Sequence, residues 1–326
     1  MDISDKILDQ LTALYGTSRT ALNILGYGLC GIAYTFVQEG NIKVLKCTVL
    51  PSGDADTVEC FRERLAFVNF LGEREVPVAR INGSLQGNLV EFIDEDQLIY
   101  ISYCMEFIEG KDYYALKQSD MDDFIVQWGK SLGQLHRWSK AYTSWKEVTV
   151  SPITGAPIFG WLKEWETFYR MAEDEDIREC WKDLKRQFIS LPLNGQTYGF
   201  IHNDPSKLNV LYARNKGIFI DFDVANYHWY MVDIANALYS ILFPDHKNYE
   251  GAAMKKEQAQ ATVSRFLMVY DRENGIDAYW IKQLNLFLSY RRILLFTAMS
   301  PSLYSNPDNF HSIRNRIIGQ TPIVEL

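Results

Sequence analysis

A 24-residue stretch, residues 200–223, constrains the fold of this chain more than any other part of the sequence. It reads FIHNDPSKLNVLYARNKGIFIDFD: an apolar lead-in, a polar loop, a short apolar run, a turn and a second apolar run. The polar loop fits the pattern H-x-D-x-x-x-x-N, which puts Asp204 and Asn209 in one connection. The second apolar run closes on Asp221 and Asp223. Three carboxylates and one amide therefore lie within a short span of chain.

The turn between the two apolar runs decides whether these polar groups meet. Asn215-Lys216-Gly217 has the composition of a hairpin turn, so we expect the second run to return beside the loop. Phosphoryl transfer needs such a cluster, because one carboxylate must orient and deprotonate an attacking hydroxyl while hard oxygen ligands hold Mg²⁺ against the phosphates. A plain surface loop of turn-forming residues would explain the H-x-D loop but not the I-D-F-D run that follows it.

The order H-x-D-x-x-x-x-N and then I-D-F-D resembles the catalytic and metal-binding segments of kinase-like phosphotransferases. It is most similar to the aminoglycoside phosphotransferase / choline kinase family, in particular to bacterial members of the homoserine and hydroxylysine kinase type. The family usually has Gly after the His, where this chain has Asn203, and PSKL replaces the usual interior of the loop. Both functional positions of the loop, Asp204 and Asn209, are retained.

The resemblance implies a role for each polar residue of this stretch. Asp204 is the expected catalytic residue, which orients the substrate hydroxyl and accepts its proton. Asn209 and Asp221 are expected to hold Mg²⁺, and Asp223 is expected to be a further metal ligand or to support the others.

Three glycines near the N-terminus fit G-x-G-x-x-G: Gly26, Gly28 and Gly31. Dinucleotide-binding folds carry the same pattern, but there it must open a helix. Here residues 32–37 are rich in β-branched and aromatic side chains, and Glu39-Gly40-Asn41 supplies a turn before a second strand at residues 42–47. Strand, glycine-rich turn and strand is a phosphate-covering hairpin of kinase type. We therefore expect these glycines to bind ATP.

The second of these strands, residues 42–47, contains Val44-Leu45-Lys46, which resembles the V-A-I-K strand of kinases. A lysine in an apolar strand is costly unless its ammonium meets an anion, and the phosphates of ATP would supply one. The alternative is an edge-strand lysine that reaches water, a role for which Lys43 is better suited. Residues 58–71 repeat apolar side chains at helical spacing. The resemblance makes Glu63 of this helix the partner of Lys46, with Glu59 as the competing candidate.

Residues 105–110, MEFIEG, resemble the M-E-x-x-x-G connection between the two lobes of the family. In that case backbone groups of Glu106 and Ile108 contact adenine, and Gly110 permits the change in chain direction.

Further features are expected to be structural. Residues 124–138 resemble the helix beneath the catalytic loop, in which His136 has a structural role. Asp233, in a D-I-A element, resembles the aspartate that braces the catalytic loop. The acidic run at residues 173–176 is more typical of a helix start than of a site for a cationic substrate. The aromatic cluster at residues 226–231 is expected to pack rather than to line a pocket.

Composition and charge exclude several classes of protein. The net charge of −8 and the pI near 5.3 argue against nucleic acid as the main partner. The five cysteines are scattered without a C-x-x-C pair, which indicates a reducing compartment and neither a disulfide framework nor a zinc site. No secretory leader and no run of membrane-spanning length is present, so we expect a cytoplasmic protein with no membrane partner. Nothing in the sequence specifies an oligomeric state.

The sequence predicts an α+β, bilobal, protein-kinase-like fold. Residues 1–105 are expected to form a nucleotide-binding lobe with a small antiparallel β-sheet and one central helix. Residues 106–326 are expected to form a larger, mainly α-helical lobe that carries the catalytic and substrate-binding residues. ATP and Mg²⁺ are expected between the lobes, beneath the glycine-rich turn.

The predicted function is that of a small-molecule kinase, which transfers the γ-phosphate of ATP to a hydroxyl of an amino alcohol, hydroxyamino acid, sugar or aminoglycoside. The alternative is a nucleotide-binding pseudokinase or structural protein with the same fold. A protein kinase is disfavoured, because the chain runs directly from Asp221 to Asp233 and leaves no room for an activation loop. Residues 1–140 carry a net charge of −7 and residues 141–326 carry −1. This distribution argues against a strongly polycationic acceptor.

Overall fold

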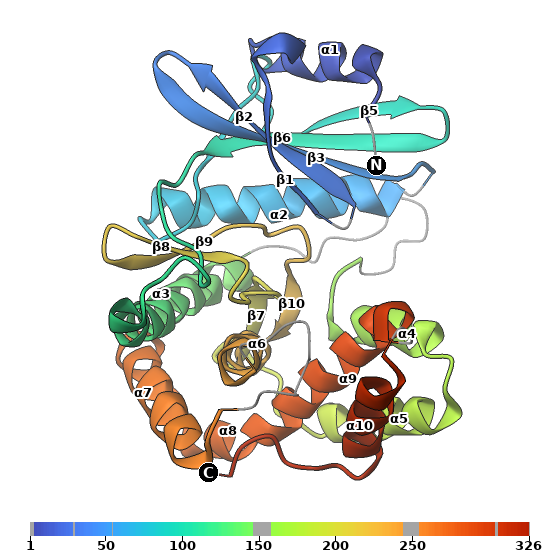
Figure 1. The fold of residues 1–326 in the computed structure, drawn as a ribbon, viewed down its shortest axis with the longest axis vertical. Helices are drawn as coiled ribbons and strands as arrows, with labels where there is room; N and C mark the ends of the chain where they lie inside the picture. The colour runs from blue at the N-terminus through green and yellow to red at the C-terminus, as the bar shows by residue number, and fades with distance from the viewer. Residues whose placement is uncertain are drawn as a thin grey trace. The chain divides into compact units, whose positions relative to one another are not determined.

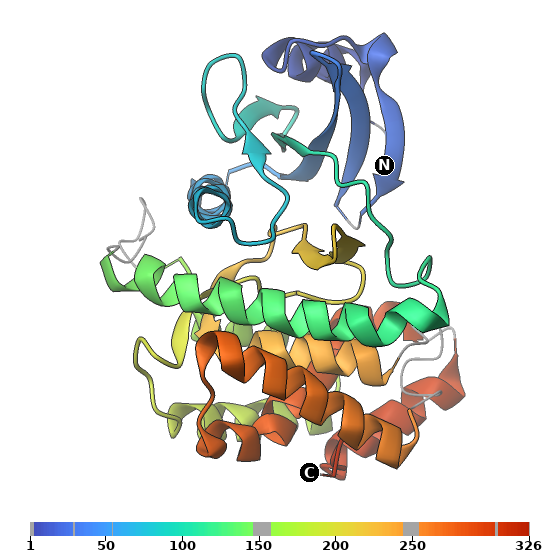
Figure 2. The ribbon, with the colours of Figure 1, turned by 90° about the vertical axis from the view of Figure 1, so that its left-hand side faces the viewer.

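The computed structural model describes residues 3–28, 30–53, 55–145, 158–243, 254–303 and 306–325. The chain forms two compact units, which are drawn in Figures 1 and 2. Unit 1 comprises the described residues up to Gly110 together with Ile158, and unit 2 comprises the remainder from Lys111 onward. None of the described helices combines the length and the apolar character that crossing a bilayer requires.

Unit 1 is built on an antiparallel sheet. Its strands are β1 (Asn23–Tyr27), β2 (Gly31–Gln38), β3 (Asn41–Pro51), β4 (Ile81–Asn82), β5 (Glu91–Glu95) and β6 (Leu98–Glu106). They pair in the order β1-β2-β3-β6-β4, and β5 also pairs with β6. Strand β3 is therefore an inner strand, with Lys46 opposite Ala33 on one side and Tyr103 on the other. The alternative that Lys43 or Lys46 lies on an edge strand is wrong.

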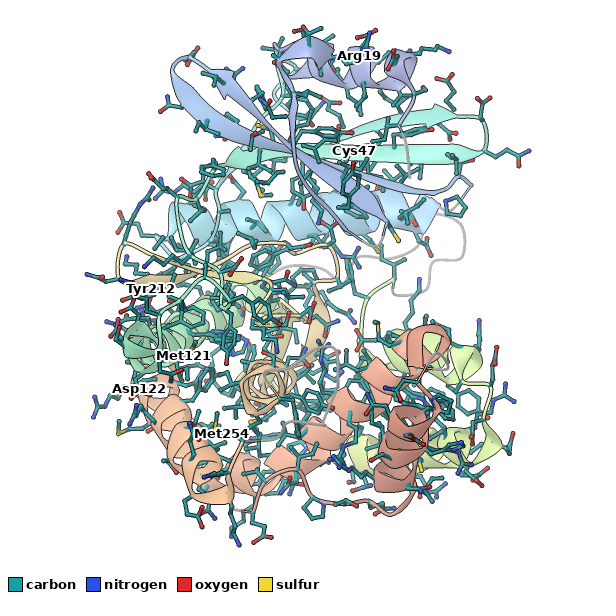
Figure 3. All side chains as sticks on the ribbon, viewed as in Figure 1. Arg19, Cys47, Met121, Asp122, Tyr212 and Met254 are labelled. Carbon is teal, nitrogen blue, oxygen red and sulfur yellow. The ribbon has the colours of Figure 1, made fainter. Side chains whose placement is uncertain are left out.

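The helices of unit 1 are α1 (Asp5–Leu14), the short 3₁₀-helix η1 (Arg19–Ala21) and α2 (Ala55–Glu73). Ile7 and Leu11 of α1 pack with Ile32 of β2 and with Cys47 of β3, which Figure 3 labels in the sheet. Burial of these apolar side chains stabilises α1 on the sheet. The apolar face of α1 is therefore buried on the sheet, and Figure 1 shows α2 on the other side of the sheet.

Unit 2 is mainly helical. Its helices are α3 (Gln118–Trp145), α4 (Trp161–Met171), α5 (Glu175–Ile189), α6 (Tyr230–Leu242), α7 (Lys256–Asn274), α8 (Ala278–Lys282), α9 (Leu284–Leu303) and α10 (Pro307–Ile318). Its described residues also form the short strands β7 (Tyr198–Ile201), β8 (Val210–Ala213), β9 (Lys216–Phe219) and β10 (Asn226–Trp229). They form two antiparallel pairs, β7 with β10 and β8 with β9. Figure 2 shows α3 and α7 side by side. The predicted α+β fold, with one sheet-containing unit and one helical unit, is confirmed.

Helix α6 follows β10 directly and forms the centre of unit 2. All of its side chains are buried except that of Ser240. Trp229 and Tyr230, at the junction of β10 and α6, are 1% and 4% exposed. The aromatic cluster is therefore packed in the core, as predicted.

The hairpin of β8 and β9 forms as predicted, but its turn lies earlier in the chain. The turn residues are Arg214 and Asn215, with φ of 53° and 55°, and Lys216 already pairs within β9. Gly217 has a different role from the one that its composition suggested. A Cβ at Gly217 would lie 3.0 Å from Cα of Trp128 in α3, so the glycine allows the hairpin to approach that helix closely.

Candidate active site

The H-x-D loop follows β7, and a buried aspartate of α6 anchors its backbone. Asp233 accepts hydrogen bonds from the backbone N–H of His202 at 3.0 Å and from the backbone N–H of Asn203 at 2.7 Å. The same carboxylate lies 3.1 Å from Nε2 of His136, which is fully buried on α3. Asn236, one turn further along α6, donates its amide to the carbonyl of Asn203 at 2.6 Å. These contacts confirm that Asp233 braces the loop and that His136 has a structural place beneath it.

Asp204 is held at both carboxylate oxygens. Oδ1 accepts a hydrogen bond from Nη2 of Arg291 on α9 at 2.7 Å, and Oδ2 accepts one from Nδ2 of Asn209 at 3.0 Å. The side chain of Asp204 is 30% exposed, while that of Arg291 is 11% exposed. Burial raises the pKa of Asp204, and the charge of Arg291 opposes that rise. The contact between Asp204 and Asn209 follows the predicted spacing, but Arg291 was not predicted as a site residue.

The I-D-F-D run lies beside the loop, as the hairpin predicted. The N–H of Ile220 donates to the carbonyl of Asn209 at 3.0 Å, and the carbonyl of Ile220 lies 2.9 Å from Nε2 of His202. These two bonds fix the position of the next residue, Asp221, relative to the loop. Asp221 has a left-handed backbone with φ of 62°, and its Oδ1 accepts the N–H of Asp223 at 3.4 Å.

The donor set of the predicted metal site consists of one amide and two carboxylates. Across the described ranges, no group of three or more His, Cys, Asp or Glu side chains is arranged to hold a metal ion. A Mg²⁺ ion bound with a nucleotide does not need such a group, because it keeps several waters and takes one or two carboxylates plus phosphate oxygens. Nδ2 of Asn209 faces Asp204, so Oδ1 is the atom that would hold a cation, together with Asp221 and Asp223. These hard oxygen donors fit Mg²⁺, but their role as ligands stays a prediction.

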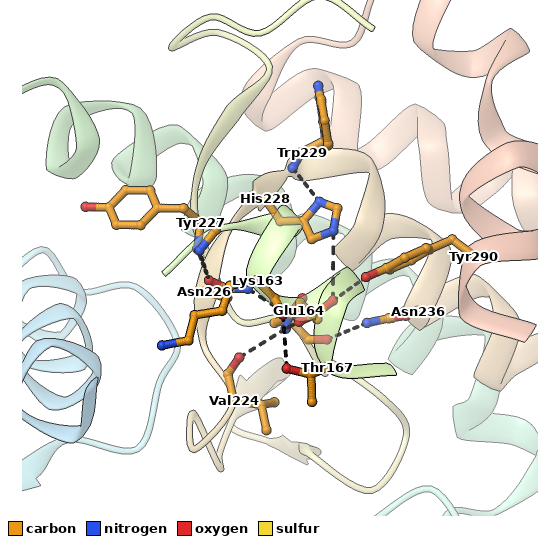
Figure 4. Close-up of polar contacts among 12 residues, drawn as sticks. Lys163, Glu164, Thr167, Val224, Asn226, Tyr227, His228, Trp229, Asn236 and Tyr290 are labelled. Carbon is orange, nitrogen blue, oxygen red and sulfur yellow. Dashed lines mark hydrogen bonds and ion pairs between the residues drawn. The ribbon is translucent and has the colours of Figure 1, made fainter. Parts of the chain in front are cut away.

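A second carboxylate, Glu164 of α4, contacts the same loop and was not predicted from the sequence. Figure 4 shows Glu164 with its neighbours Tyr290 and Asn226. Its Oε1 accepts the hydroxyl of Tyr290 at 2.6 Å. Its Oε2 accepts a hydrogen bond from Nδ2 of Asn203 and another, at 3.4 Å, from Nδ2 of Asn226. Nε2 of His228 lies 3.9 Å from Oε1. Burial raises the pKa of Glu164, and the hydrogen bonds from Tyr290 and the two asparagines oppose that rise.

The sequence contained a signal for one of these missed residues and none for the other. Arg291 and Arg292 are consecutive arginines in an otherwise apolar helix, and a buried arginine requires a partner. Glu164 lies among the polar residues of an amphipathic helix, where a carboxylate normally faces solvent. Only the tertiary structure distinguishes Glu164, whose side chain is 12% exposed, from Glu166, whose side chain is 47% exposed.

The glycine-rich turn of unit 1 connects β1 and β2, so the strand–turn–strand prediction is confirmed. The N–H of Gly28 donates to the carbonyl of Gly31 at 2.8 Å. A Cβ at Gly31 would lie 2.3 Å from the carbonyl oxygen of Cys47, whereas a Cβ at Gly26 would meet no atom within 4 Å. Gly31 is therefore required by the packing of β2 on β3. Leu29 lies outside the described residues, and phosphate binding by the three glycines stays a prediction.

The two lysines of β3 have different surroundings. The ammonium of Lys46 lies 5.9 Å from the ring centroid of Tyr103, and Lys43 donates to Oδ1 of Asn82 at 3.0 Å. Glu63 is partly buried on α2, while Glu59 pairs with Arg62 at 3.0 Å on the same helix. These contacts do not test the pairing of Lys46 with Glu63, which stays a prediction.

The predicted adenine contacts lie at the end of β6. The N–H of Glu106 donates to the carbonyl of Arg80 at 2.9 Å, and Oε1 of Glu106 accepts the N–H of Arg80 at 3.1 Å. Any backbone contact of Glu106 with adenine would therefore use its carbonyl. Ile108 is buried, and its predicted contact is likewise untested.

The acidic run at residues 173–176 is a helix start. Asp174 caps α5 by accepting the N–H groups of Asp176 and Ile177. Arg314 of α10 donates to Asp174 and to Asp176, each at 2.5 Å. The contacts with Arg314 and the cap on α5 agree with the prediction that the run is a helix start.

Comparison with known proteins identifies the family. A family model described as the phosphotransferase enzyme family matches residues 36–262, which is more than two thirds of the chain. The chain belongs to this family. The match confirms the resemblance carried by H-x-D-x-x-x-x-N and I-D-F-D, and it makes the chain a phosphotransferase enzyme.

Individual relatives of this phosphotransferase are distant. The chain is similar to amicoumacin kinase of Bacillus subtilis (strain 168), with 23% identity over 299 residues that cover 90% of this chain and 83% of the relative. A solved amicoumacin kinase in complex with AMP-PNP, Ca²⁺ and Ami has a TM-score of 0.83 at 19% identity and covers 100% of this chain and 96% of that one. A microcompartment-associated aminopropanol kinase has a TM-score of 0.70 at 18% identity and covers 97% and 95%. These likenesses establish the kinase-like fold.

Proposed function

We propose that this phosphotransferase transfers the γ-phosphate of ATP, bound with Mg²⁺, to a hydroxyl of a small molecule. The observation that carries the proposal is the setting of Asp204. Its partly exposed carboxylate is oriented by Asn209 and Arg291, in a loop whose backbone is anchored by Asp233. A carboxylate held in one orientation is suited to receive the proton of an attacking hydroxyl.

Asp204 acts as the base in the proposed reaction. The hydroxyl oxygen of the acceptor attacks the γ-phosphorus, the bond from that phosphorus to the β,γ-bridging oxygen breaks, and ADP leaves. The hydroxyl proton passes to Asp204, which must therefore be ionised beforehand. Arg291 favours the ionised form, and burial opposes it.

The remaining residues bind and orient the nucleotide. Unit 1 is the proposed nucleotide-binding part, and unit 2 carries the catalytic and acceptor-binding residues. Asn209, Asp221 and Asp223 would hold Mg²⁺, which would neutralise charge on the phosphates. Residues of unit 1 hold the phosphates and adenine: Gly26, Gly28, Gly31, Lys46 with Glu63, and the backbone of Glu106 and Ile108. The relative solved with AMP-PNP and Ca²⁺ supports ATP and a divalent ion as cofactors.

We propose an amino alcohol or an amicoumacin-type compound as the acceptor. Two relatives are named for amicoumacin and aminopropanol. The near-neutral charge of residues 141–326 supports this class over a polycationic aminoglycoside. The ion pairs of Asp174 and Asp176 with Arg314 also remove one acidic cluster from the binding of a polycation.

The test is transfer of labelled γ-phosphate from ATP across a panel of amicoumacin, aminopropanols, hydroxyamino acids, sugars and aminoglycosides. We expect Mg²⁺-dependent transfer with the highest kcat/KM for an amino alcohol or amicoumacin, and loss of transfer in the Asp204→Asn variant. An aminoglycoside as the best acceptor would contradict the acceptor class. Nucleotide binding without transfer to any acceptor would favour the pseudokinase alternative.

A further inference from the structure

The residue before Asp204 has an unusual backbone conformation. Asn203 has φ of 70°, in the left-handed region that glycine adopts most readily. This explains why the family usually has glycine at this position, and asparagine is among the residues that tolerate the region best. Because Asn203 is not glycine, its conformation depends on what the side chain contacts as well as on the backbone hydrogen bonds to Asp233 and Asn236.

The side chain of Asn203 is clamped by two elements of unit 2. Its Nδ2 donates to Oε2 of Glu164 on α4 and, at 3.1 Å, to the carbonyl of Val224, just after the I-D-F-D run. Asn203 is 8% exposed, and the side chain of Glu164 is 12% exposed. A hydrogen bond at so buried a position is stronger than one at the surface, because the local dielectric constant is low.

Glu164 is connected to Asp204 by two routes. One route runs through Asn203, the neighbour of Asp204 in the chain. The other runs through α9, where Tyr290 donates to Glu164 at 2.6 Å and the next residue, Arg291, donates to Asp204 at 2.7 Å. In the loop, Glu164 holds Asn203 and Arg291 holds the next residue, Asp204. In α9, Tyr290 contacts Glu164, and the next residue, Arg291, contacts Asp204.

We propose that Glu164 is a positioning residue for the phosphotransfer reaction. It holds Asn203 in the left-handed conformation and thereby sets the direction of the Asp204 carboxylate. Glu164 acts on the reacting atoms only through its neighbours, and its effect on the rate passes mainly through Asn203, because the route through Tyr290 reaches Asp204 only by way of the next residue of α9. The inference rests on the proposed role of Asp204, and it explains the left-handed conformation at Asn203 by this chain's own side chains.

The first test compares three variants on α4. Glu164→Ala removes the acceptor and should lower kcat about 10–100-fold with little change in KM for ATP, because a small misplacement of a catalytic group has an effect of that size. Glu164→Gln keeps an oxygen for Asn203 and a polar group for the Tyr290 hydroxyl, so it should retain kcat within about threefold. Glu166→Ala, on the exposed part of the same helix, is the matched control and should be silent.

The second test is a double-mutant cycle with Asn203→Gly. Glycine adopts the left-handed conformation without help from a side chain, so N203G alone should keep most of the activity. In that background E164A should lower kcat less than about threefold, since the contact through which Glu164 acts is gone. If E164A lowered kcat by the same factor in both backgrounds, the proposal would be overturned. An effect of E164A on the KM of the acceptor alone would also overturn it, because it would mark Glu164 as an acceptor contact.

A readout that needs no acceptor separates this inference from the proposed function. Hydrogen exchange of the backbone N–H of Asn203, which donates a hydrogen bond to Asp233, should be at least about tenfold faster in E164A. Amides within α6 should keep their exchange rates, which excludes general unfolding. If the wild type phosphorylates no acceptor, the proposed function is wrong, but the exchange measurement still tests whether Glu164 holds Asn203. Unchanged exchange at Asn203 would overturn the inference.

Discussion

Nη2 of Arg291 lies 2.7 Å from Oδ1 of Asp204, although 87 positions separate the two residues in the chain. The pair joins α9 to the loop that carries the proposed base. It keeps a positive charge beside a carboxylate that must be ionised to work. We therefore predict that Arg291 influences the pH range in which Asp204 can accept a proton, in addition to orienting it.

Removal of Arg291 should move the acidic limb of the kcat–pH profile. Burial raises the pKa of Asp204 and Arg291 opposes that rise, so Arg291→Ala should raise the pKa further. Activity is lost as pH falls through this pKa, so the acidic limb of the variant should lie at higher pH than in the wild type. Arg170→Ala, whose side chain is 80% exposed on α4, is the control. Superimposable profiles for R291A and wild type would contradict the role of Arg291.

The glycines of the β1–β2 turn should differ in their effect on stability. Gly31→Ala would place a methyl group 2.3 Å from the carbonyl oxygen of Cys47, so β2 and β3 must separate. We expect a loss of about 1–3 kcal/mol in the free energy of unfolding, measured by denaturant titration. Gly26→Ala meets no atom within 4 Å and should change that free energy by less than about 0.5 kcal/mol. Equal stability of the two variants would contradict the observed packing of Gly31.

The two lysines of β3 should be distinguished by nucleotide use. Lys46→Ala should raise KM for ATP or lower turnover while the protein still folds, because the ammonium is proposed to hold phosphates. Lys43→Ala loses its hydrogen bond to Asn82, which should lower stability by about 1 kcal/mol and leave ATP use nearly unchanged. Steady-state kinetics with varied ATP and thermal unfolding of both variants make the comparison. Unchanged KM and turnover in K46A would remove Lys46 from the site.

Features set by local pattern were predictable from the sequence. The apolar spacing at residues 58–71 indicated α2, and Phe61, Leu65, Val68 and Leu71 are all buried there. The contact of Asp204 with Asn209 followed from their spacing within one loop, and the return of Asp221 followed from the hairpin. In each case the residues that decide the structure are close together in the chain.

Features that depend on distant contacts were not predictable. Glu164 meets Asn203 and Tyr290, which are 39 and 126 positions away, and no periodicity marks such pairs. The turn of the β8–β9 hairpin was placed too late because Gly217 serves the approach to Trp128 and not the turn itself. The position of β3 inside the sheet likewise depends on its pairing with β6, a strand much further along the chain.

Asp204 and Asp221, at the centre of the proposed site, should differ in what their substitution changes. Asp204→Asn keeps the shape of the side chain but removes the base, so kcat should fall about 10²–10⁴-fold while the affinity for Mg²⁺·ATP stays nearly unchanged. Asp221→Asn removes a hard anionic ligand, so it should weaken Mg²⁺-dependent nucleotide binding as well as turnover.

The measurement that tests this most directly is calorimetric titration of Mg²⁺·ATP into both variants, combined with single-turnover rates on an accepted substrate. We predict wild-type nucleotide affinity with slow chemistry for D204N, and reduced affinity with slow chemistry for D221N. Wild-type binding and wild-type rates in both variants would contradict the account and would put the active site elsewhere in the chain.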